Sequence, residues 1–343
     1  MPDAATSRSA LIDALADPGR PTPLPTLAEL EAAAALVYAA MPPTPQYTWP
    51  LLNERSGAEV WVKHENHTPV GAFKVRGGVV YFDWLSRAHP EVEGVVTATR
   101  GNHGQSVGLA ARRRGLRAAI VVPHGNSVEK NAAMRALGVE LIEEGDDFQA
   151  ASEHAEKIAA ARGWHRMPSF SPLLVAGVGT YAVELFRNAP VLDAVYVPIG
   201  LGSGACGVLA ARDALSPSTE VVGVVSSGAP AYARAIASGK LESHAVTTVL
   251  ADGMACRTPV ASAVTALRAG LARVLEVEED EVASAMRALF VDTHNVAEGA
   301  GGAALAACLK ERDGVRGRRV AVVVTGGNVD AVVFERVLRS GAD

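Results

Sequence analysis

Short apolar runs rich in β-branched residues alternate with amphipathic segments along most of the chain. The runs predict buried strands, at residues 59–63, 94–98, 118–122, 139–142, 194–198, 220–225 and 319–324. Several of them are separated by segments with helical spacing of apolar residues, which predict helices, at residues 73–85, 104–114, 127–137 and 147–162. Strands that alternate with helices favour an α/β fold, in which parallel sheets carry helices on both faces.

The N-terminal region has two parts of different character. Residues 1–25 are rich in Pro, Ala and Asp and predict a loosely attached arm. Residues 26–41 predict a helix, because Thr26 and Glu29 are spaced as a capping box. The Pro42-Pro43 pair cannot continue that helix and should end it.

The block of strands and helices from about residue 94 to 171 predicts a small domain. It would be inserted between the two parts of a large domain, residues 1–93 and 172–343. In its helix 127–137, the spacing places Lys130 on the outer face. Ligands of such sheets bind at the carboxyl ends of the strands, so we expect the loops that follow the strands to face one site.

The composition is that of a globular protein and argues against several other classes. Of the 343 residues, 49% are hydrophobic and 20% are charged, so the chain can bury a sizeable core. The net charge is −5 and the basic residues are spread out, which argues against a nucleic-acid-binding surface. The three cysteines predict neither a metal site nor a disulfide framework. We see no signal peptide and no membrane-spanning run, and we therefore expect a cytoplasmic protein.

Lys74 lies in the run GAFKVRGG, residues 71–78, at the expected start of a helix. The positive end of the helix dipole disfavours a charged lysine there. A nucleophilic amine benefits instead, because positive surroundings and burial lower its pKa. The alternative is a solvated surface lysine, which the apolar, glycine-rich neighbours of Lys74 disfavour. The ring of Phe73 would be either a core side chain or a face for a flat cofactor.

A second motif, TRGNHGQ at residues 99–105, lies between a strand and a helix. Backbone amides at the start of that helix suit a carboxylate. The side chain of Asn102 can donate a hydrogen bond to an oxygen of a bound cofactor. Taken alone, Asn102 is better explained as a turn residue and helix cap. We assign His103 no catalytic role.

Two further loops follow strands. Gly200, Gly202, Ser203 and Gly204 come after the strand 194–198 and just before a helix. Their backbone amides suit a phosphate, although any tight strand–helix turn has a similar sequence. Thr325 follows the strand 319–324, where its hydroxyl can hydrogen-bond a pyridine nitrogen.

One reactive amine and three loops of this kind are what a pyridoxal phosphate (PLP) enzyme needs. The amine forms a Schiff base, one loop holds the phosphate, and the others contact the pyridine ring and the substrate carboxylate. A neutral hydroxyl such as that of Thr325 would not keep the ring nitrogen protonated, which suits rapid β-elimination. Glu298 and Asp252 need no part in this site, because a helix start explains the first and a turn explains the second.

The runs FKVRG and GNHGQ, in this order, resemble fold-type II PLP enzymes. The more specific resemblance is to the serine/threonine dehydratase group, which includes threonine ammonia-lyase and serine racemase, and it covers roughly residues 40–340. It implies two open, twisted parallel sheets flanked by helices, as in the tryptophan synthase β fold, with a small domain inserted in a large one. It also implies that Lys74 is the Schiff-base lysine, that Phe73 packs beside the cofactor ring, and that Asn102 contacts the phenolic oxygen.

The same resemblance implies the remaining contacts. The phosphate would lie on Gly200, Gly202, Ser203 and Gly204, and the pyridine nitrogen would meet Thr325. The substrate carboxylate would be held by the second motif, at Thr99, Arg100, Gly101, Asn102 and His103.

The chain departs from the group at several positions. Ala72 stands where the group usually has Ser, and residues 200–204 replace a run of four glycines and Leu. Arg100 stands where serine racemase places its second acid/base, which argues against racemisation because a guanidinium stays protonated. Residues 226–231 contain no carboxylate for a divalent-cation site. The chain ends soon after Thr325, so we expect no C-terminal regulatory domain.

The leading hypothesis is a PLP-dependent ammonia-lyase that acts on a β-hydroxy-α-amino acid. Lys74 would remove the Cα proton, hydroxide would leave from Cβ, and the product would hydrolyse to a 2-keto acid and ammonia. L-Threonine and L-serine are the default substrates, with 3-hydroxyaspartate and phenylserine as alternatives. Other hypotheses are an amino-acid racemase, a β-replacement enzyme, or a non-catalytic amino-acid-binding protein. By resemblance we expect a homodimer.

Overall fold

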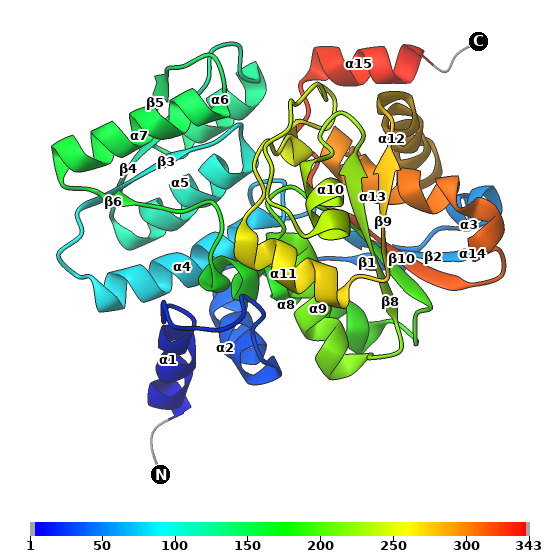
Figure 1. The fold of residues 1–343 in the computed structure, drawn as a ribbon, viewed down its shortest axis with the longest axis horizontal. Helices are drawn as coiled ribbons and strands as arrows, with labels where there is room; N and C mark the ends of the chain where they lie inside the picture. The colour runs from blue at the N-terminus through cyan, green and yellow to red at the C-terminus, as the bar shows by residue number, and fades with distance from the viewer. Residues whose placement is uncertain (1–3, 341–343) are drawn as a thin grey trace.

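The computed structural model describes residues 4–340 and contains two sheets, which lie on opposite sides of the molecule (Figure 1). The larger sheet has six strands in the order β1-β2-β10-β7-β8-β9. They are β1 (Gln46–Thr48), β2 (Glu59–His64), β7 (Ala194–Pro198), β8 (Glu220–Ser226), β9 (Arg273–Val277) and β10 (Arg319–Val324). Neighbouring strands are parallel except at one edge, where β1 runs antiparallel to β2. The predicted parallel arrangement is confirmed, with this short edge strand as an antiparallel addition.

The smaller sheet has four parallel strands in the order β5-β4-β3-β6. They are β3 (Gly94–Ala98), β4 (Arg117–Val122), β5 (Glu140–Glu143) and β6 (His165–Arg166). All four lie within the segment 94–171, and the α/β fold class is confirmed. The division into an inserted small domain and a large domain stays a prediction, because helices from the N-terminal part also cover this sheet.

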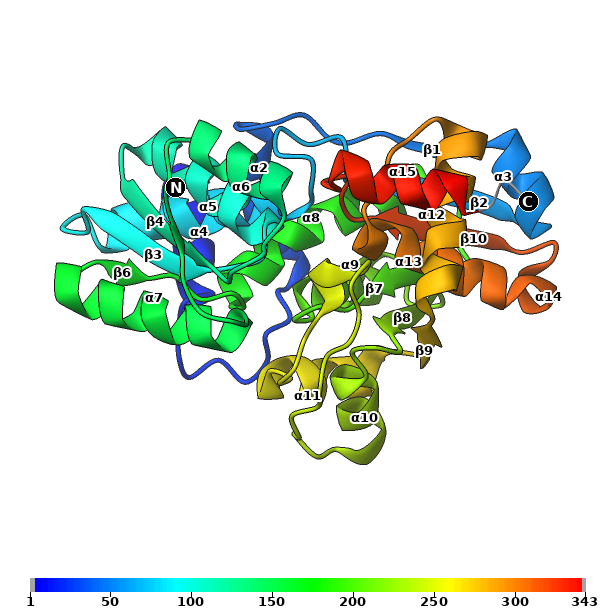
Figure 2. The same ribbon diagram turned by 90° about the horizontal axis from the view of Figure 1, so that it is seen from above.

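Helices cover both sheets on both faces (Figures 1 and 2). Those in the first half are α1 (Ala4–Ala14), α2 (Leu27–Tyr38), α3 (Pro50–Ser56), α4 (Lys74–Ala88), α5 (Asn102–Arg114), α6 (Val128–Ala136), α7 (Phe148–Arg162) and α8 (Pro172–Asn188). Those in the second half are α9 (Ser203–Leu215), α10 (Ala231–Ser238), α11 (Ala261–Gly270), α12 (Glu279–Thr293), α13 (Gly299–Lys310), α14 (Arg312–Val315) and α15 (Ala331–Arg339), with a 3-10 turn, η1 (Asp252–Met254). None of the helices between residues 4 and 340 is long and apolar enough to cross a membrane.

Alternate residues of the central strand β10 enter different cores. Val320, Val322 and Val324 pack in the core formed with α12 and α13. Ala321 and Val323 pack on the other face, with α8 and α9. Successive side chains of a strand point to opposite faces, so the continuous apolar run that predicted this strand reflects a sheet that is buried on both sides.

The smaller sheet is buried in the same way. Val95 and Ile120 face the core that contains residues of α1, α2, α4 and α5. Val96 and Val121 face α7. Since α4 also packs against α8, this helix joins the two halves of the molecule, and Lys74 is its first residue.

The N-terminal segment is more firmly attached than the sequence suggested. For residues 4–25 the expectation of a loose arm is wrong, because Ile12 and Leu15 are buried against α2 and α4. Residues 1–3 of the predicted arm lie outside the described part of the chain. The two side chains are three positions apart and lie on one face of the chain, which is sufficient to dock a short helix. The predicted capping box of Thr26 and Glu29 is present at the start of α2.

Candidate active site

Segments that are far apart in the sequence meet around Lys74. The backbone amide of Phe73 donates to the carbonyl of Thr325 over 3.0 Å. A Cβ atom placed on Gly204 would lie 3.6 Å from the ring of Phe73. The lysine motif, the Thr325 loop and the glycine loop, which were singled out separately in the sequence, therefore lie together.

The environment of Lys74 lowers the charge on its amine. The side chain is half-buried, and its Nζ lies 5.0 Å from the centroid of the Phe73 ring. Burial lowers the pKa of Lys74 from 10.5 to about 8, against the opposing charge of Glu298. In a fraction of the molecules the amine is then neutral near physiological pH, and the neutral form is the nucleophile and the base.

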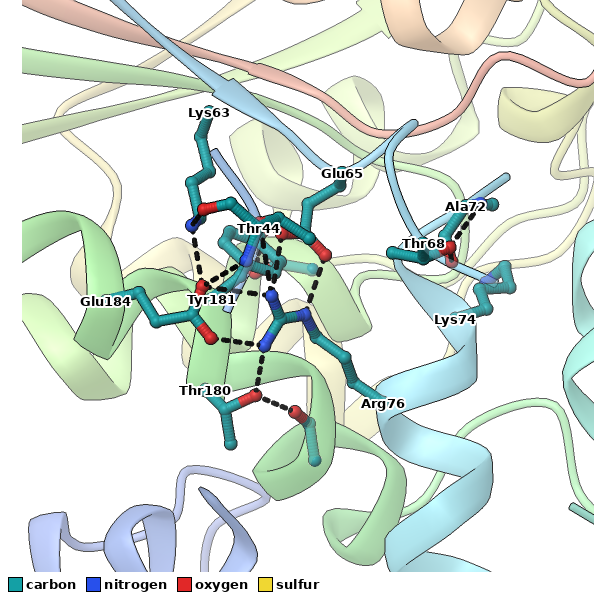
Figure 3. Close-up of polar contacts among 12 residues, drawn as sticks. Thr44, Lys63, Glu65, Thr68, Ala72, Lys74, Arg76, Thr180, Tyr181 and Glu184 are labelled. Atoms are coloured by element: carbon teal, nitrogen blue, oxygen red, sulfur yellow. Dashed lines mark hydrogen bonds and ion pairs between the residues drawn. The ribbon is translucent and has the colours of Figure 1, made fainter. Parts of the chain in front are cut away.

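The turn before Lys74 is held by its own hydrogen bonds (Figure 3). The hydroxyl of Thr68 donates to the carbonyl of Ala72 and accepts from its amide, both over 2.9 Å. Gly71 has a φ of +67°, a conformation that glycine adopts without strain. A Cβ atom on Gly71 would also come within 2.6 Å of Oδ1 of Asn328. The turn thus leaves room for Asn328 to approach the site.

Asn102, the first residue of α5, has both ends of its amide group engaged. Its Oδ1 accepts from Nδ2 of Asn328 over 2.9 Å, and its Nδ2 donates to Oε1 of Glu298 over 2.5 Å. Nδ2 of Asn328 also donates to the carbonyl of Val70 over 2.8 Å. Glu298 was explained above by the helix dipole alone, and Asn328 had no assigned role. The structure brings both residues to the site.

Lys130 is buried in this network. Only 6% of it is exposed, and its Nζ lies 3.1 Å from Oε2 of Glu298 and 2.8 Å from Oδ2 of Asp252. The prediction of an outward-facing Lys130 is wrong, because the first turn of α6 faces loops of the larger sheet rather than solvent. Burial alone would lower the pKa of Lys130, but the charges of Glu298 and Asp252 raise it. Burial raises the pKa of Glu298, and the charge of Lys130 opposes that rise.

The predicted carboxylate-binding motif forms the start of α5. Thr99 is buried, and its hydroxyl accepts from the amide of Gly101 over 3.0 Å. The amides of Asn102 and His103 belong to the first turn of the helix, where backbone N–H groups have no partner within the helix. His103 is buried, and this burial, followed by the charge of Lys74, lowers its pKa to about 3, so the ring is neutral. Arg100 is half-buried beside them.

The glycine loop also forms the start of a helix. Gly202 is the N-cap of α9, with a φ of +93° that favours glycine. A Cβ atom on Gly200 would lie 2.6 Å from the carbonyl of Gly253, so only glycine fits there. Ser203 is buried, and the carbonyl of Gly204 accepts from the hydroxyl of Tyr181 over 3.2 Å. The following helix directs its positive end at this loop, as a phosphate requires.

A cluster of four buried charges lies behind Lys74 (Figure 3). The guanidinium of Arg76 contacts Glu65 over 2.7 Å and Glu184 over 2.6 Å. The ammonium of Lys63 lies 2.6 Å from Glu184. The hydroxyl of Thr44 donates to Glu65 over 2.5 Å. The two positive and two negative charges balance, so this cluster adds no net charge to the core.

The cluster ties the start of α4 to the larger sheet, because Lys63 lies in β2, Arg76 in α4 and Glu184 in α8, and Glu65 directly follows β2. Burial alone would raise the pKa of Glu184, but the charges of Arg76 and Lys63 lower it overall. Burial lowers the pKa of Lys63, against the charges of Glu65 and Glu184. No pattern in the sequence predicted this cluster. The one sequence feature that pointed to it is the placing of charged residues, Lys63 and Glu65, at alternate positions at the end of an apolar strand.

The residues around Lys74 fit the expected cofactor. They provide an amine of lowered pKa at Lys74, a glycine without a side chain next to the Phe73 ring, and a hydrogen-bonded network that passes through Asn102. A family model described as pyridoxal-phosphate dependent enzyme matches residues 37–326.

Curated relatives resemble the chain over most of its length. L-Threonine ammonia-lyase of Thermotoga maritima is 34% identical over 292 residues, which are 85% of this chain and 72% of that protein. The biosynthetic L-threonine dehydratase of Haemophilus influenzae is 32% identical over 297 residues, which are 86% of this chain but 58% of that protein.

Solved structures show the same architecture. The processed form of threonine deaminase isoform 2 from Solanum lycopersicum superimposes with a TM-score of 0.84 at 26% identity, over 100% of this chain and 95% of that one. Maize serine racemase gives a TM-score of 0.84 at 25% identity, over 92% and 97%. The predicted fold of two twisted sheets flanked by helices is confirmed.

Proposed function

Because the chain belongs to the pyridoxal-phosphate dependent enzymes, we propose that it is an ammonia-lyase that eliminates water from a β-hydroxy-α-amino acid. The products would be a 2-keto acid and ammonia. The observation that carries the proposal is Lys74, whose half-buried amine of lowered pKa lies among the glycine loop, the Thr325 loop and the start of α5. The relatives described as L-threonine ammonia-lyase support L-threonine, and by close chemistry L-serine, as substrates.

Five parts of the chain would hold the cofactor. Lys74 would bind it covalently, and Phe73 would pack beside its ring. Asn102 would donate to its phenolic oxygen, and Thr325 would meet its pyridine nitrogen. Its phosphate would bind to residues 200–204, supported by the helix start there and by the three glycines of the loop.

Different residues of the site would have different roles in the elimination. When bound, the cofactor supplies the carbonyl to which the substrate nitrogen attaches and a conjugated ring that accepts an electron pair. Lys74 takes the proton from Cα as general base, for which a pKa of about 8 is suitable. The amides of residues 99–103 hold the substrate carboxylate, and so orient the Cα–H bond toward the amine. His103, being neutral, leaves the carboxylate charge to these amides.

The first test is keto-acid release from a panel of amino acids by the purified protein with added PLP. The panel contains L-threonine, L-serine, D-serine, both diastereomers of 3-hydroxyaspartate, and phenylserine. We expect turnover of L-threonine and L-serine. Preference for 3-hydroxyaspartate would instead assign Arg100 to a second carboxylate. If the visible absorbance of bound cofactor is present but no member of the panel is turned over, the proposed elimination is refuted. Racemase or β-replacement chemistry would then be favoured.

The substitution Gly204→Ala tests the phosphate loop. A Cβ there meets only ordinary contacts, 3.4 Å from the hydroxyl of Tyr181 and 3.6 Å from Phe73, so the cofactor-free protein should keep its stability. A methyl group against the phosphate should weaken PLP binding about tenfold, which corresponds to about 1.4 kcal/mol. Fluorescence titration with PLP measures this affinity. Unchanged affinity would exclude close approach of the phosphate to Gly204.

We also propose that the chain acts as a homodimer in the cytoplasm. Only the family resemblance supports these two statements, and the catalytic proposal does not depend on either of them.

A further inference from the structure

A continuous series of hydrogen bonds and ion pairs joins the two halves of the molecule at Asn102. It begins at the carbonyl of Val70, passes through Asn328 and Asn102 to Glu298, and ends at Lys130. Lys130 lies on α6 beside the smaller sheet, whereas Glu298 precedes α13 of the larger sheet. The charge that closes the series therefore comes from the other half of the molecule.

The series determines which end of the Asn102 amide faces Glu298. The carbonyl of Val70 can only accept, so the group of Asn328 that faces it is Nδ2. The same Nδ2 donates to Asn102, which must therefore present its oxygen on that side. The NH₂ group of Asn102 is left to face Glu298. One of its two hydrogens goes to Glu298, and the other has no partner among residues 4–340.

The bond from Asn102 to Glu298 strengthens this orientation only while Glu298 accepts. The carboxylate is 2% exposed, and burial favours its neutral form, which could donate a proton instead of accepting one. Lys130 lies 3.1 Å from the other oxygen of Glu298, and Asp252 holds the ammonium in place from the far side. The aliphatic part of Lys130 fills the space beside Gly101, where a Cβ would lie 2.4 Å from its Cδ. Its position is thus set by packing as well as by charge.

Separate contacts dock the same turn of α6 onto the larger sheet. The hydroxyl of Ser127 donates to Oδ1 of Asp330 over 2.5 Å. The amide of Ala331 donates to Glu129 over 2.8 Å. Docking of α6 and the charge of Lys130 can therefore be varied independently.

We propose that Lys130 is a positioning residue for the reaction: by holding Glu298 as a hydrogen-bond acceptor, it keeps the second N–H of Asn102 available to the cofactor. The proposal rests on the proposed contact between Asn102 and the phenolic oxygen of PLP. Lys130 itself touches neither substrate nor cofactor. Lys130 lies on α6, beside the smaller sheet, whereas Glu298 belongs to the larger one. The contact between Lys130 and Glu298 would therefore form only when α6 is docked against the loops of the larger sheet.

The test is the substitution Lys130→Met in the holoenzyme. The visible absorbance band of the bound cofactor should shift, because its phenolic oxygen loses a fixed donor. We expect kcat to fall roughly tenfold to a hundredfold, with a smaller change in KM, as for displacement of a group that orients the reaction. Glu298→Gln, with Lys130 intact, should shift the band in the same direction, and the double variant should shift it no further.

Two matched controls separate this role from a structural one. Glu129→Ala removes a docking contact of the same helix but leaves the N-cap and Lys130 in place, and it should keep the wild-type spectrum. Lys157→Met removes an exposed charge from α7, beside the same sheet, and should change neither spectrum nor kcat. A wild-type spectrum in Lys130→Met, or an equal shift in Glu129→Ala, would overturn the inference. Absence of a visible band in the wild-type protein with PLP would instead contradict the proposed function.

Discussion

Lys74→Ala is expected to abolish keto-acid release and the visible absorbance of bound PLP together. The amine of Lys74 is the only group assigned both to bind the cofactor and to take the Cα proton. Removal of a general base alone typically lowers the rate by about 10²–10⁴-fold, and loss of covalent cofactor binding adds to this. Keto-acid assays and absorbance spectra with and without added PLP measure the two effects.

Stability distinguishes this outcome from misfolding. Burial disfavours the charged amine, and its pKa is lowered to about 8, so removal of Lys74 should not lower the melting temperature of the cofactor-free protein. Lys157→Ala, at an exposed position of α7, serves as the control and should keep full turnover. Full turnover by Lys74→Ala would refute the assignment of the catalytic lysine.

Arg76→Met is expected to have the largest effect on folding. It leaves Glu65 without an ion-pair partner, and leaves Glu184 paired only with Lys63. Leaving a charge buried without its partner typically costs about 3–5 kcal/mol of unfolding free energy. Urea denaturation of the cofactor-free protein measures this loss. The benefit of the intact cluster over an apolar core is much smaller, because burial of the ions is itself costly.

The surface pair of Arg339 and Glu335 offers a matched control. Both side chains are largely exposed, 79% and 58%, so Arg339→Met should cost only about 0–1 kcal/mol. The double variant of Arg76→Met with Glu65→Leu removes one charge of each sign. It should recover part of the loss, because Lys63 and Glu184 remain as a neutral pair. An equal loss in Arg76→Met and Arg339→Met would show that the cluster does not bear on stability.

Much of the fold could be predicted from local patterns. The central strands β7 and β10 appear at the residues that the apolar runs indicated, because both faces of the sheet are buried and the runs are continuous. The edge strands β1, β6 and β9 were missed. They are short and less completely buried, so their sequence carries little periodic signal.

In the candidate site, too, some features could be predicted from the local sequence and others could not. The sequence by itself determined the segments that carry chemistry: Lys74 at a helix start, Asn102 in one strand–helix loop, and the glycines of residues 200–204 in another. These depend on neighbours within a few residues, because helix starts and tight turns are local structures. The placement of Lys130 and the charge cluster around Arg76 was decided by the tertiary structure alone. Glu184 lies 108 positions from Arg76, and Asp252 lies 122 positions from Lys130. Whether a charge is solvated or buried depends on which surface covers it.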